Sequence, residues 1–175
     1  MKDEKVIHWM STNLVTIEPR TTLPDAYKLM KKFDIRRLPV IDFGKLVGIV
    51  TLGDIREARP SQVTSLSIYE LNYLLSQLKI ERIMSHEPIT ISSEATIGQA
   101  AKLMYEHKVG CLPVKEADRL IGLITESDIF RVIARGVGEI PPEIATVPKK
   151  VMAKEPTGKR QQKVFPAANP YTNPI

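Results

Sequence analysis

Residues 38–55 read LPVIDFGKLVGIVTLGDI, and residues 112–129 read LPVKEADRLIGLITESDI. The two stretches lie 74 residues apart, and the same shift makes 17 of the 49 positions from 9 to 57 identical to their counterparts without a gap. Two copies are too few for a solenoid. The repeat therefore predicts two homologous halves packed about a pseudo-twofold axis, with paired sites where equivalent residues of the halves meet.

The sequence of each half predicts the same order of elements, β-α-β-β-α. This order places the chain in the mixed α/β (α+β) class. In the first half, the residue pattern favours a strand at 14–17, a helix at 24–33 capped by Thr22, strands at 38–41 and 46–50, and a helix from about residue 51. In the second half, the same elements fall at 89–91, 97–106, 112–114, 120–124 and 127–135.

Repeat and composition together predict four regions. We expect one repeat unit at 6–58, a helical inter-repeat segment at 59–82, a second repeat unit at 83–135 and a Pro-rich basic tail at 136–175. Residues 1–133 hold 18 Lys and Arg against 17 Asp and Glu, whereas residues 134–175 hold 7 against 3, so the basic excess lies in the tail. Because the tail lacks sustained periodicity, we expect it to be extended or disordered.

The inter-repeat segment predicts an amphipathic helix. Ser67 with Glu70 three residues later is typical of a capping box at a helix start. The apolar residues of the segment fall on one helical face: Ile68, Leu71, Leu74, Leu75 and Leu78. We expect this face to pack against the core of the repeats or against a partner subunit, and a role in ligand binding is the weaker alternative.

The bulk composition is that of a soluble globular protein, with 43% hydrophobic and 26% charged residues. No apolar run approaches the ~20 residues that a membrane helix needs. The charged N-terminus, MKDEK, lacks the apolar region of a signal peptide, and the single cysteine excludes an internal disulfide. We therefore expect a cytoplasmic protein that does not bind a membrane.

The basic tail allows two interpretations. A solubilising terminus is favoured, because aromatic residues do not alternate with the basic ones and no folded basic face is predicted. Contact with RNA, DNA or an acidic partner is the weaker alternative. The basic residues concerned are Lys149, Lys150, Lys154, Lys159, Arg160 and Lys163.

The most specific local pattern is Gly-x-x-Thr-x-x-Asp, which occurs at 48–54 and again at 122–128. One interpretation is structural, because Thr at a helix N-cap with Asp three residues later caps the helix without any ligand. The other is functional. A helix start with a Thr hydroxyl can hold a phosphate, and the Asp carboxylate can accept hydrogen bonds from both ribose hydroxyls. Both interpretations make the same residues candidates: Thr51, Asp54, Thr125 and Asp128.

Arg36 and Arg37 are the next candidates. Two adjacent cations before a strand, in an otherwise near-neutral domain, can receive a phosphate chain through bidentate hydrogen bonds. The alternative is a solvated loop in which they pair with Asp34. The second half has Gly110 and Cys111 at these positions. We therefore expect two chemically unequal sites, of which one holds phosphate more strongly.

Catalytic groups are not recognisable in the sequence. Cys111 has no second Cys or suitably spaced His nearby, so we expect a small buried side chain rather than a reactive thiol. The three histidines, His8, His86 and His107, lack the spacing of zinc ligands. The sequence contains no P-loop, glycine-rich dinucleotide loop or nucleophile-and-base motif. We therefore expect a protein that is not an enzyme and holds no metal.

Residues 35–55 and 109–129 resemble the second half of a CBS motif. The Met-Ser-x-x-x-x-Thr-Ile sequences that begin at Met10 and Met84 resemble its first half. Over roughly residues 6–135 the chain resembles a tandem CBS protein, or Bateman module, and its insert and second repeat are most similar to AcuB-type stand-alone CBS proteins. It departs from these in its Pro-rich tail, where many of them carry a further regulatory domain.

The resemblance implies two β-α-β-β-α units packed sheet against sheet, and a homodimer. It also implies a sensor that binds AMP, ADP, ATP or S-adenosylmethionine between the repeats and signals to a partner or a dimer mate. A ligand-free dimerisation module is the alternative.

By position, the resemblance implies that the Asp of each motif binds the ribose and that the Thr of each motif binds phosphate. It also implies that Arg36 and Arg37 contact phosphate. The backbone near residues 16–17 and 90–91, together with Ile35 and Val109, would hold the adenine. The full set of expected ligand-binding residues is Thr16, Ile17, Ile35, Arg36, Arg37, Pro39, Thr51, Asp54, Thr90, Ile91, Val109, Gly110, Cys111, Pro113, Thr125 and Asp128.

Overall fold

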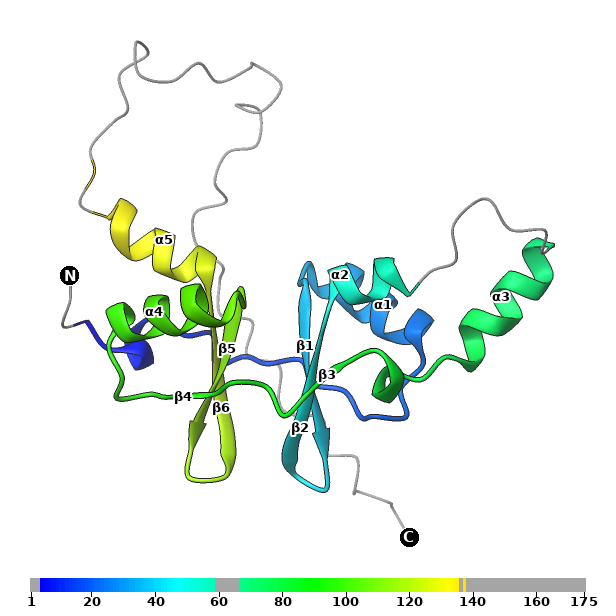
Figure 1. Cartoon of the computed structure of the whole chain (residues 1–175), viewed down its shortest axis with the longest axis horizontal. Coiled ribbons are helices and arrows are strands. Elements are labelled where there is room, and N and C mark those ends of the chain that lie inside the picture. The colour runs from blue at the N-terminus through cyan, green and yellow to red at the C-terminus, as the bar shows by residue number, and fades with distance from the viewer. Residues whose placement is uncertain (1–3, 59–66, 136, 138–175) are drawn as a thin grey trace, which may run out of the picture. The chain divides into compact units, whose positions relative to one another are not determined.

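A β-hairpin forms the centre of each repeat (Figure 1). The computed structural model describes residues 4–58, 67–135 and 137, and divides the chain into the units Met1–Gly136 and Val137–Ile175, of which the first is described below. In repeat 1, β1 (Arg37–Asp42) pairs antiparallel with β2 (Lys45–Thr51). In repeat 2, β5 (Cys111–Glu116) pairs with β6 (Arg119–Thr125) in the same register. Each hairpin lies at the sequence position that its repeated apolar residues predicted.

Two helices accompany each hairpin and lie on one side of it in Figure 1. They are α1 (Leu23–Phe33) and α2 (Leu52–Glu57) in repeat 1, and α4 (Ile97–His107) and α5 (Glu126–Ala134) in repeat 2. The predicted N-cap is confirmed, because the hydroxyl oxygen of Thr22 accepts a hydrogen bond from Asp25 N at 3.3 Å. The helix bounds lie within two residues of the predicted ones.

The predicted first strand of each repeat is much shorter in the structure. Instead of a strand at 14–17, Ile17 forms a single parallel bridge with Val40. Its counterpart is β4 (Ile91–Ser92), which pairs in parallel with β5. The β-branched pattern predicted extended backbone correctly, but only the last residues of each segment reach the neighbouring strand.

The edge strand β3 (Ser85–His86) was not predicted. It lies at the start of repeat 2 and yet pairs antiparallel with β2 of repeat 1. The counterpart interaction joins Ser11, near the start of repeat 1, to Leu123 of β6. The two sheets therefore have the orders β1-β2-β3 and β4-β5-β6, and each is extended by the segment that leads into the other repeat.

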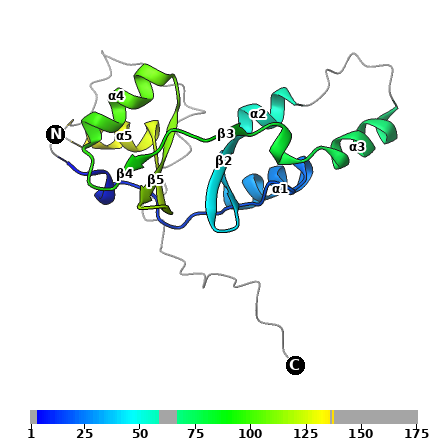
Figure 2. The same ribbon diagram turned by 60° about the horizontal axis from the view of Figure 1, so that its bottom comes forward.

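These lead-in segments, residues 4–11 and 78–85, also complete the two hydrophobic cores. Val6, in a 3-10 turn at Val6–His8, is fully buried in the core of repeat 2, and its N–H donates to Ala95 O at 2.8 Å. Ile80, in the turn at Ile80–Arg82, is fully buried in the core of repeat 1 and donates to Thr21 O at 2.9 Å. Figure 2 shows the N-terminal segment beside β4, far from its own repeat.

The sheets of the two repeats meet at a third, smaller core. Ile49 of β2 packs there with Cys111 of β5 and Leu123 of β6, and Leu14 contacts the cluster. This contact confirms the expected packing of sheet against sheet.

The inter-repeat helix is confirmed as α3 (Ile68–Gln77). Ser67 and Glu70 form the predicted capping box, since Ser67 N donates to the Glu70 carboxylate at 2.8 Å and Glu70 N donates to Ser67 Oγ at 3.3 Å. Leu75 and Leu78 pack against the core of repeat 1, while Leu74 is half exposed. The side chains of the other two residues of the predicted apolar face, Ile68 and Leu71, lie outside the described residues, as does the basic tail.

Candidate ligand site between the repeats

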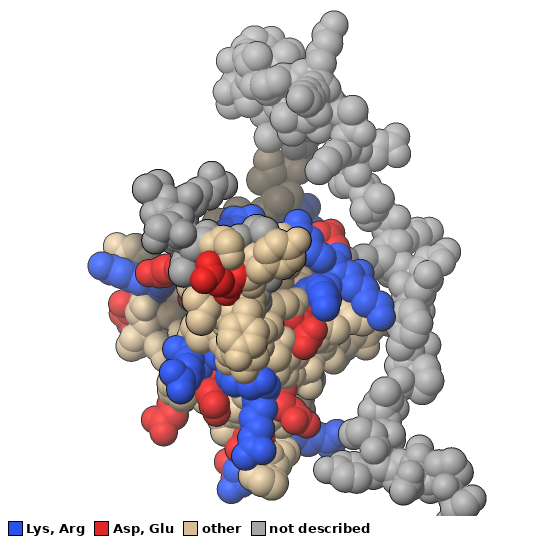
Figure 3. Space-filling model, turned by 90° about the vertical axis from the view of Figure 1, so that its right-hand side faces the viewer, with Lys and Arg blue, Asp and Glu red and all other residues tan. Residues whose placement is uncertain are grey.

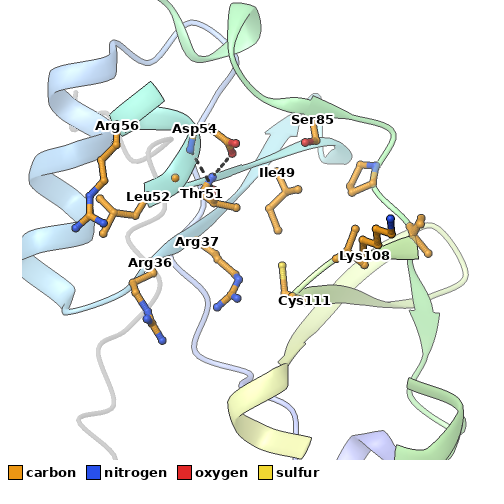
Figure 4. Close-up of a pocket in the computed structure, with 15 residues that line it drawn as sticks. Arg36, Arg37, Ile49, Thr51, Leu52, Asp54, Arg56, Ser85, Lys108 and Cys111 are labelled. Atoms are coloured by element: carbon orange, nitrogen blue, oxygen red, sulfur yellow. Dashed lines mark hydrogen bonds between the residues drawn. The ribbon is translucent and has the colours of Figure 1, made fainter. Parts of the chain in front are cut away.

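A cavity of about 490 Å³ lies between the two repeats (Figure 4). Repeat 1 supplies Arg36 and Arg37 at the start of β1, the end of β2 and residues of α2. Ser85 of β3 lies beside β2 on the same wall. The rest of the lining comes from Pro88 and Ile89 and from the end of α4 to the first residue of β5, at 108–111. The cavity therefore exists only because the two repeats pack together.

Seven of the expected ligand-binding residues line this cavity: Arg36, Arg37, Thr51, Asp54, Val109, Gly110 and Cys111. The remaining nine do not line it. Ile17 and Ile91 are buried in the cores of repeats 1 and 2, and Pro39 and Pro113 are fully buried within the hairpins. The others in this group are Thr16, Ile35, Thr90, Thr125 and Asp128.

Thr51 and Asp54 cap α2 and face the cavity. Thr51 N donates to Asp54 Oδ2 at 2.7 Å, and Asp54 N donates to the Thr51 hydroxyl oxygen at 3.3 Å. The structural interpretation of the motif is therefore correct for this copy. The capping hydrogen bonds leave a donor free for a ligand, because the Thr51 hydroxyl can still donate its proton. Within the described part of the chain, no hydrogen bond or ion pair engages Asp54 Oδ1.

The second copy of the motif is closed by internal contacts. Asp128 is 4% exposed, and its Oδ2 accepts from Thr125 N at 3.0 Å and from the Thr125 hydroxyl at 2.7 Å. Its Oδ1 lies 3.2 Å from Nη1 of Arg131. Repeat 1 has Glu57 at the position of Arg131, so Asp54 has no equivalent cation. The two aspartates therefore differ, since one offers a carboxylate oxygen to the cavity and the other is held internally.

The two arginines and the Gly-Cys pair that replaces them line the same cavity. Gly110 lies close to the guanidinium of Arg37, because a Cβ atom on this glycine would stand 2.7 Å from Arg37 Nη2. Arg37 thus reaches across to repeat 2 (Figure 4). The prediction of two unequal sites assigned these two pairs to different clefts. In the structure both pairs line one cavity, so the difference between them does not distinguish two clefts.

Cys111 is a buried thiol at the floor of the site, as expected. Burial raises the pKa of this thiol above its ordinary value. The positive charge of Arg37 and its hydrogen bond to the sulfur lower the pKa again, but burial is the larger effect. At neutral pH the group is therefore a protonated thiol, which is a weak nucleophile.

Several cavity residues were not predicted. Ile49, Leu52 and Ile89 give the cavity apolar walls, while Arg56 and Lys108 add two cations to it. Ile89 had a signal in the sequence, because it stands in the repeated Met-Ser-x-x-x-x-Thr-Ile segment that was expected near the ligand. Arg56 and Lys108 had none, since the halves differ at both positions.

Two interlocked β-α-β-β-α repeats around a shared cavity define a pseudosymmetric two-repeat module. A family model of the CBS domain matches residues 4–61 and 80–135. The chain belongs to the CBS domain family and carries two CBS repeats, so it is a regulatory module and not an enzyme. In the described residues no helix is long and apolar enough to cross a membrane, and no cluster of three potential metal ligands occurs.

The curated relatives include a CBS domain-containing protein of similar length. A CBS domain-containing protein of Dictyostelium discoideum is 38% identical over 136 residues, which are 77% of this chain and 94% of that protein. Four further curated relatives are longer, and the chain spans only 22% to 48% of their length.

Three solved structures share the fold. An acetoin utilization protein (AcuB) from Vibrio cholerae has a TM-score of 0.61 and 32% identity, covering 75% of this chain and 90% of that one. The CBS domain pair of protein MJ0100, in complex with 5′-methylthioadenosine and S-adenosyl-L-methionine, has a TM-score of 0.64, 27% identity and coverages of 76% and 98%. CBSX2 in complex with AMP has a TM-score of 0.61, 29% identity and coverages of 75% and 97%. The predicted similarity to AcuB-type proteins is thereby confirmed.

Proposed function

We propose that this protein is a sensor that binds an adenosine ligand in the cavity between its repeats. The observation that carries the proposal is the free carboxylate oxygen of Asp54, which lines the same cavity as the Thr51 hydroxyl and the arginines at 36 and 37. A carboxylate that accepts from ribose hydroxyls, beside donors for phosphate, is complementary to a nucleotide. The cavity volume of about 490 Å³ falls within the range of small-molecule sites.

The expected contacts follow from the walls of the cavity. Asp54 Oδ1 accepts from the ribose, and the Thr51 hydroxyl, Arg36 and Arg37 donate to phosphate. The apolar side chains of Ile89 and Val109, with Ile49 on the facing wall, form the surface for the base. The MJ0100 and CBSX2 structures support an adenosine ligand, because each was solved with adenosine-containing molecules bound.

Signalling follows from the position of the cavity. Because both repeats line it, a ligand that contacts both walls favours one arrangement of the repeats over others. Only such a difference in affinity shifts an equilibrium between conformations. We propose that this shift is passed to a regulated protein or to a second copy of the chain, and that the protein acts in the cytoplasm.

Thermal unfolding of the full chain with AMP, ADP, ATP and S-adenosylmethionine tests the proposal. A ligand at 100 times its Kd adds about 2.7 kcal/mol to the free energy of unfolding. The absence of a shift with every one of these ligands would favour the alternative, a dimerisation module whose Thr-Asp pairs are only helix caps.

The two aspartates provide a matched pair of variants. Asp54→Ala is expected to weaken binding about tenfold to a hundredfold, since it removes a hydrogen bond to a charged acceptor. Asp128→Ala removes a buried carboxylate with three internal partners. It should lower the free energy of unfolding by about 1–3 kcal/mol and change the affinity less. Calorimetric titration and urea unfolding of both variants measure this, and equal losses of affinity would contradict the assigned difference.

Homodimerisation is the second part of the proposal. Phe33 at the end of α1, Tyr105 on α4 and Phe130 on α5 expose large apolar surface. Of these helices α4 and α5 contact each other, so Tyr105 and Phe130 lie on neighbouring helices, and exposed apolar surface of this kind is typical of an interface. Light scattering after size-exclusion chromatography, with and without nucleotide, measures the mass, and a monomer at all concentrations would contradict this part.

A further inference from the structure

Positive charge predominates in the cavity. Four cations line it, Arg36, Arg37, Arg56 and Lys108, against the single carboxylate of Asp54. Within the described residues, none of the four cations lies within 4.0 Å of a carboxylate oxygen. Figure 4 places the three arginines on the repeat-1 wall and Lys108 on the opposite wall. On the face drawn in Figure 3, by contrast, basic and acidic side chains are interspersed.

One further carboxylate approaches this group from outside the cavity wall. A Cβ atom on Gly110 would stand 2.9 Å from Glu126 Oε2 and 2.7 Å from Arg37 Nη2, so Glu126 and Arg37 meet at this glycine. Glu126 offsets part of the charge of Arg37. Arg36, Arg56 and Lys108 remain for a ligand, together with the partly offset charge of Arg37.

The internal repeat shows that this charge is specific to one side of the molecule. Under the 74-residue shift, Lys108 corresponds to Asp34, Arg56 to Phe130 and Leu52 to Glu126. The three counterpart residues, which do not line the cavity, therefore have two fewer cations and two more carboxylates. The backbone does not cause the difference, because Asp34 and Lys108 both end a helix in the left-handed conformation, with φ of 51° and 55°.

We infer that the cavity selects adenosine polyphosphates, ADP or ATP, over AMP, adenosine and S-adenosylmethionine. The inference rests on the proposed function and specifies its ligand. Each added phosphate brings negative charge and acceptor oxygens to this group of three guanidinium groups and one ammonium group. S-adenosylmethionine carries a sulfonium and an ammonium group against one carboxylate, so its net positive charge is repelled there.

The test is calorimetric titration of the full chain with ATP, ADP, AMP, adenosine and S-adenosylmethionine at low and high salt. We expect ATP to bind at least about tenfold more tightly than adenosine or S-adenosylmethionine, with AMP between them. The advantage of ATP should shrink at high salt, because exposed charges are screened. Equal affinity for all five ligands, or tighter binding of S-adenosylmethionine, would overturn the inference while leaving the proposed function intact. Absence of binding by any of them would overturn both.

Charge-swap variants test whether the preference for ATP arises in the cavity. Lys108→Asp places the residue of the counterpart position on a backbone that already suits it, and we expect about tenfold weaker ATP binding with unchanged adenosine binding. Asp34→Lys is the matched control, and the double variant Lys108→Asp/Asp34→Lys restores the net charge of the chain. The double variant should bind ATP as weakly as Lys108→Asp alone. Recovery of ATP binding in the double variant would mean that net charge, not the cavity, sets the preference.

A second variant guards against misfolding of the first. Arg56→Gln, on the other wall, should also lower the affinity for ATP more than the affinity for adenosine. An equal loss for both ligands in Arg56→Gln and Lys108→Asp would overturn the inference, because it would show a structural role for these side chains.

Discussion

At the scale of single residues, a methionine from each lead-in segment packs on a motif glycine of the other repeat. A Cβ atom on Gly48 would stand 2.5 Å from Met84 Sδ and 3.0 Å from the backbone oxygen of Ser85. On Gly122, the nearest atoms would all belong to the side chain of Met10. The glycine of the Gly-x-x-Thr-x-x-Asp pattern thus makes room for a methionine of the other half, which explains why Met and Gly both recur in the repeat.

This packing predicts a coupling between residues far apart in the sequence. Gly122→Ala should lower the free energy of unfolding by about 1–3 kcal/mol, because the added methyl group overpacks the site. Met10→Ala should relieve that clash, so the double variant should be more stable than the sum of the single losses implies. Urea unfolding of the three variants measures the coupling.

The other glycine is the control for this double-mutant cycle. Gly48→Ala also meets the backbone oxygen of Ser85, which cannot rotate away as a side chain can. Met84→Ala should therefore rescue Gly48→Ala less completely than Met10→Ala rescues Gly122→Ala. Strictly additive losses in both cycles would show that the methionines do not limit space at the glycines.

At the scale of elements, the corresponding helices α1 and α4 begin with related but different caps. Thr96 and Gln99 form a capping box on α4, since Gln99 N donates to the Thr96 hydroxyl oxygen at 3.2 Å and Thr96 N donates to Gln99 Oε1 at 2.8 Å. On α1 the hydroxyl of Thr22 donates to Asp25 Oδ2 at 2.7 Å. This hydrogen bond is the main reason that the pKa of Asp25 is lowered, with Lys28 contributing further.

The two caps should respond differently to pH. Thr96→Ala is expected to cost about 1 kcal/mol at every pH, because Gln99 does not titrate. A lowered pKa in the folded state stabilises the protein above the ordinary pKa of Asp25, and this contribution disappears as the pH falls through the lowered value. The cost of Thr22→Ala should therefore shrink on acidification below about pH 4. Urea unfolding of both variants between neutral and acid pH measures it, and parallel curves for the two would contradict the role given to Asp25.

Local patterns in the sequence predicted the elements whose stabilising contacts are local. The hairpins follow from two short apolar runs on either side of a turn. Thr22 and Ser67 mark helix starts through contacts three residues away. The strand at 14–17 is shorter than predicted and β3 was not predicted for the same reason, because the pairing of both depends on a strand that is distant in the sequence. Arg56 and Lys108 were not predicted at the site because the two halves differ at both positions.

At the scale of the whole molecule, the exchange of lead-in segments could not be deduced from the repeat. A shift of 74 residues is equally consistent with each segment packing on its own half or on the other one. The structure shows the second arrangement, with Val6 in the core of repeat 2 and Ile80 in the core of repeat 1. The hydrogen bonds that hold the two segments correspond one to one under the same shift.

Because each core is completed by the lead-in segment of the other repeat, the described unit should unfold as one cooperative body. Val6→Ala removes a fully buried side chain and should cost about 2 kcal/mol. Trp9, the single tryptophan, packs against the core of repeat 2 and reports on that core, whereas far-ultraviolet circular dichroism reports on the helices of both repeats. In urea, the two signals should shift together to a lower midpoint. If the fluorescence transition moved alone and left a later helical transition in place, the repeats would be independent, and a ligand between them would have no rigid second half through which to act.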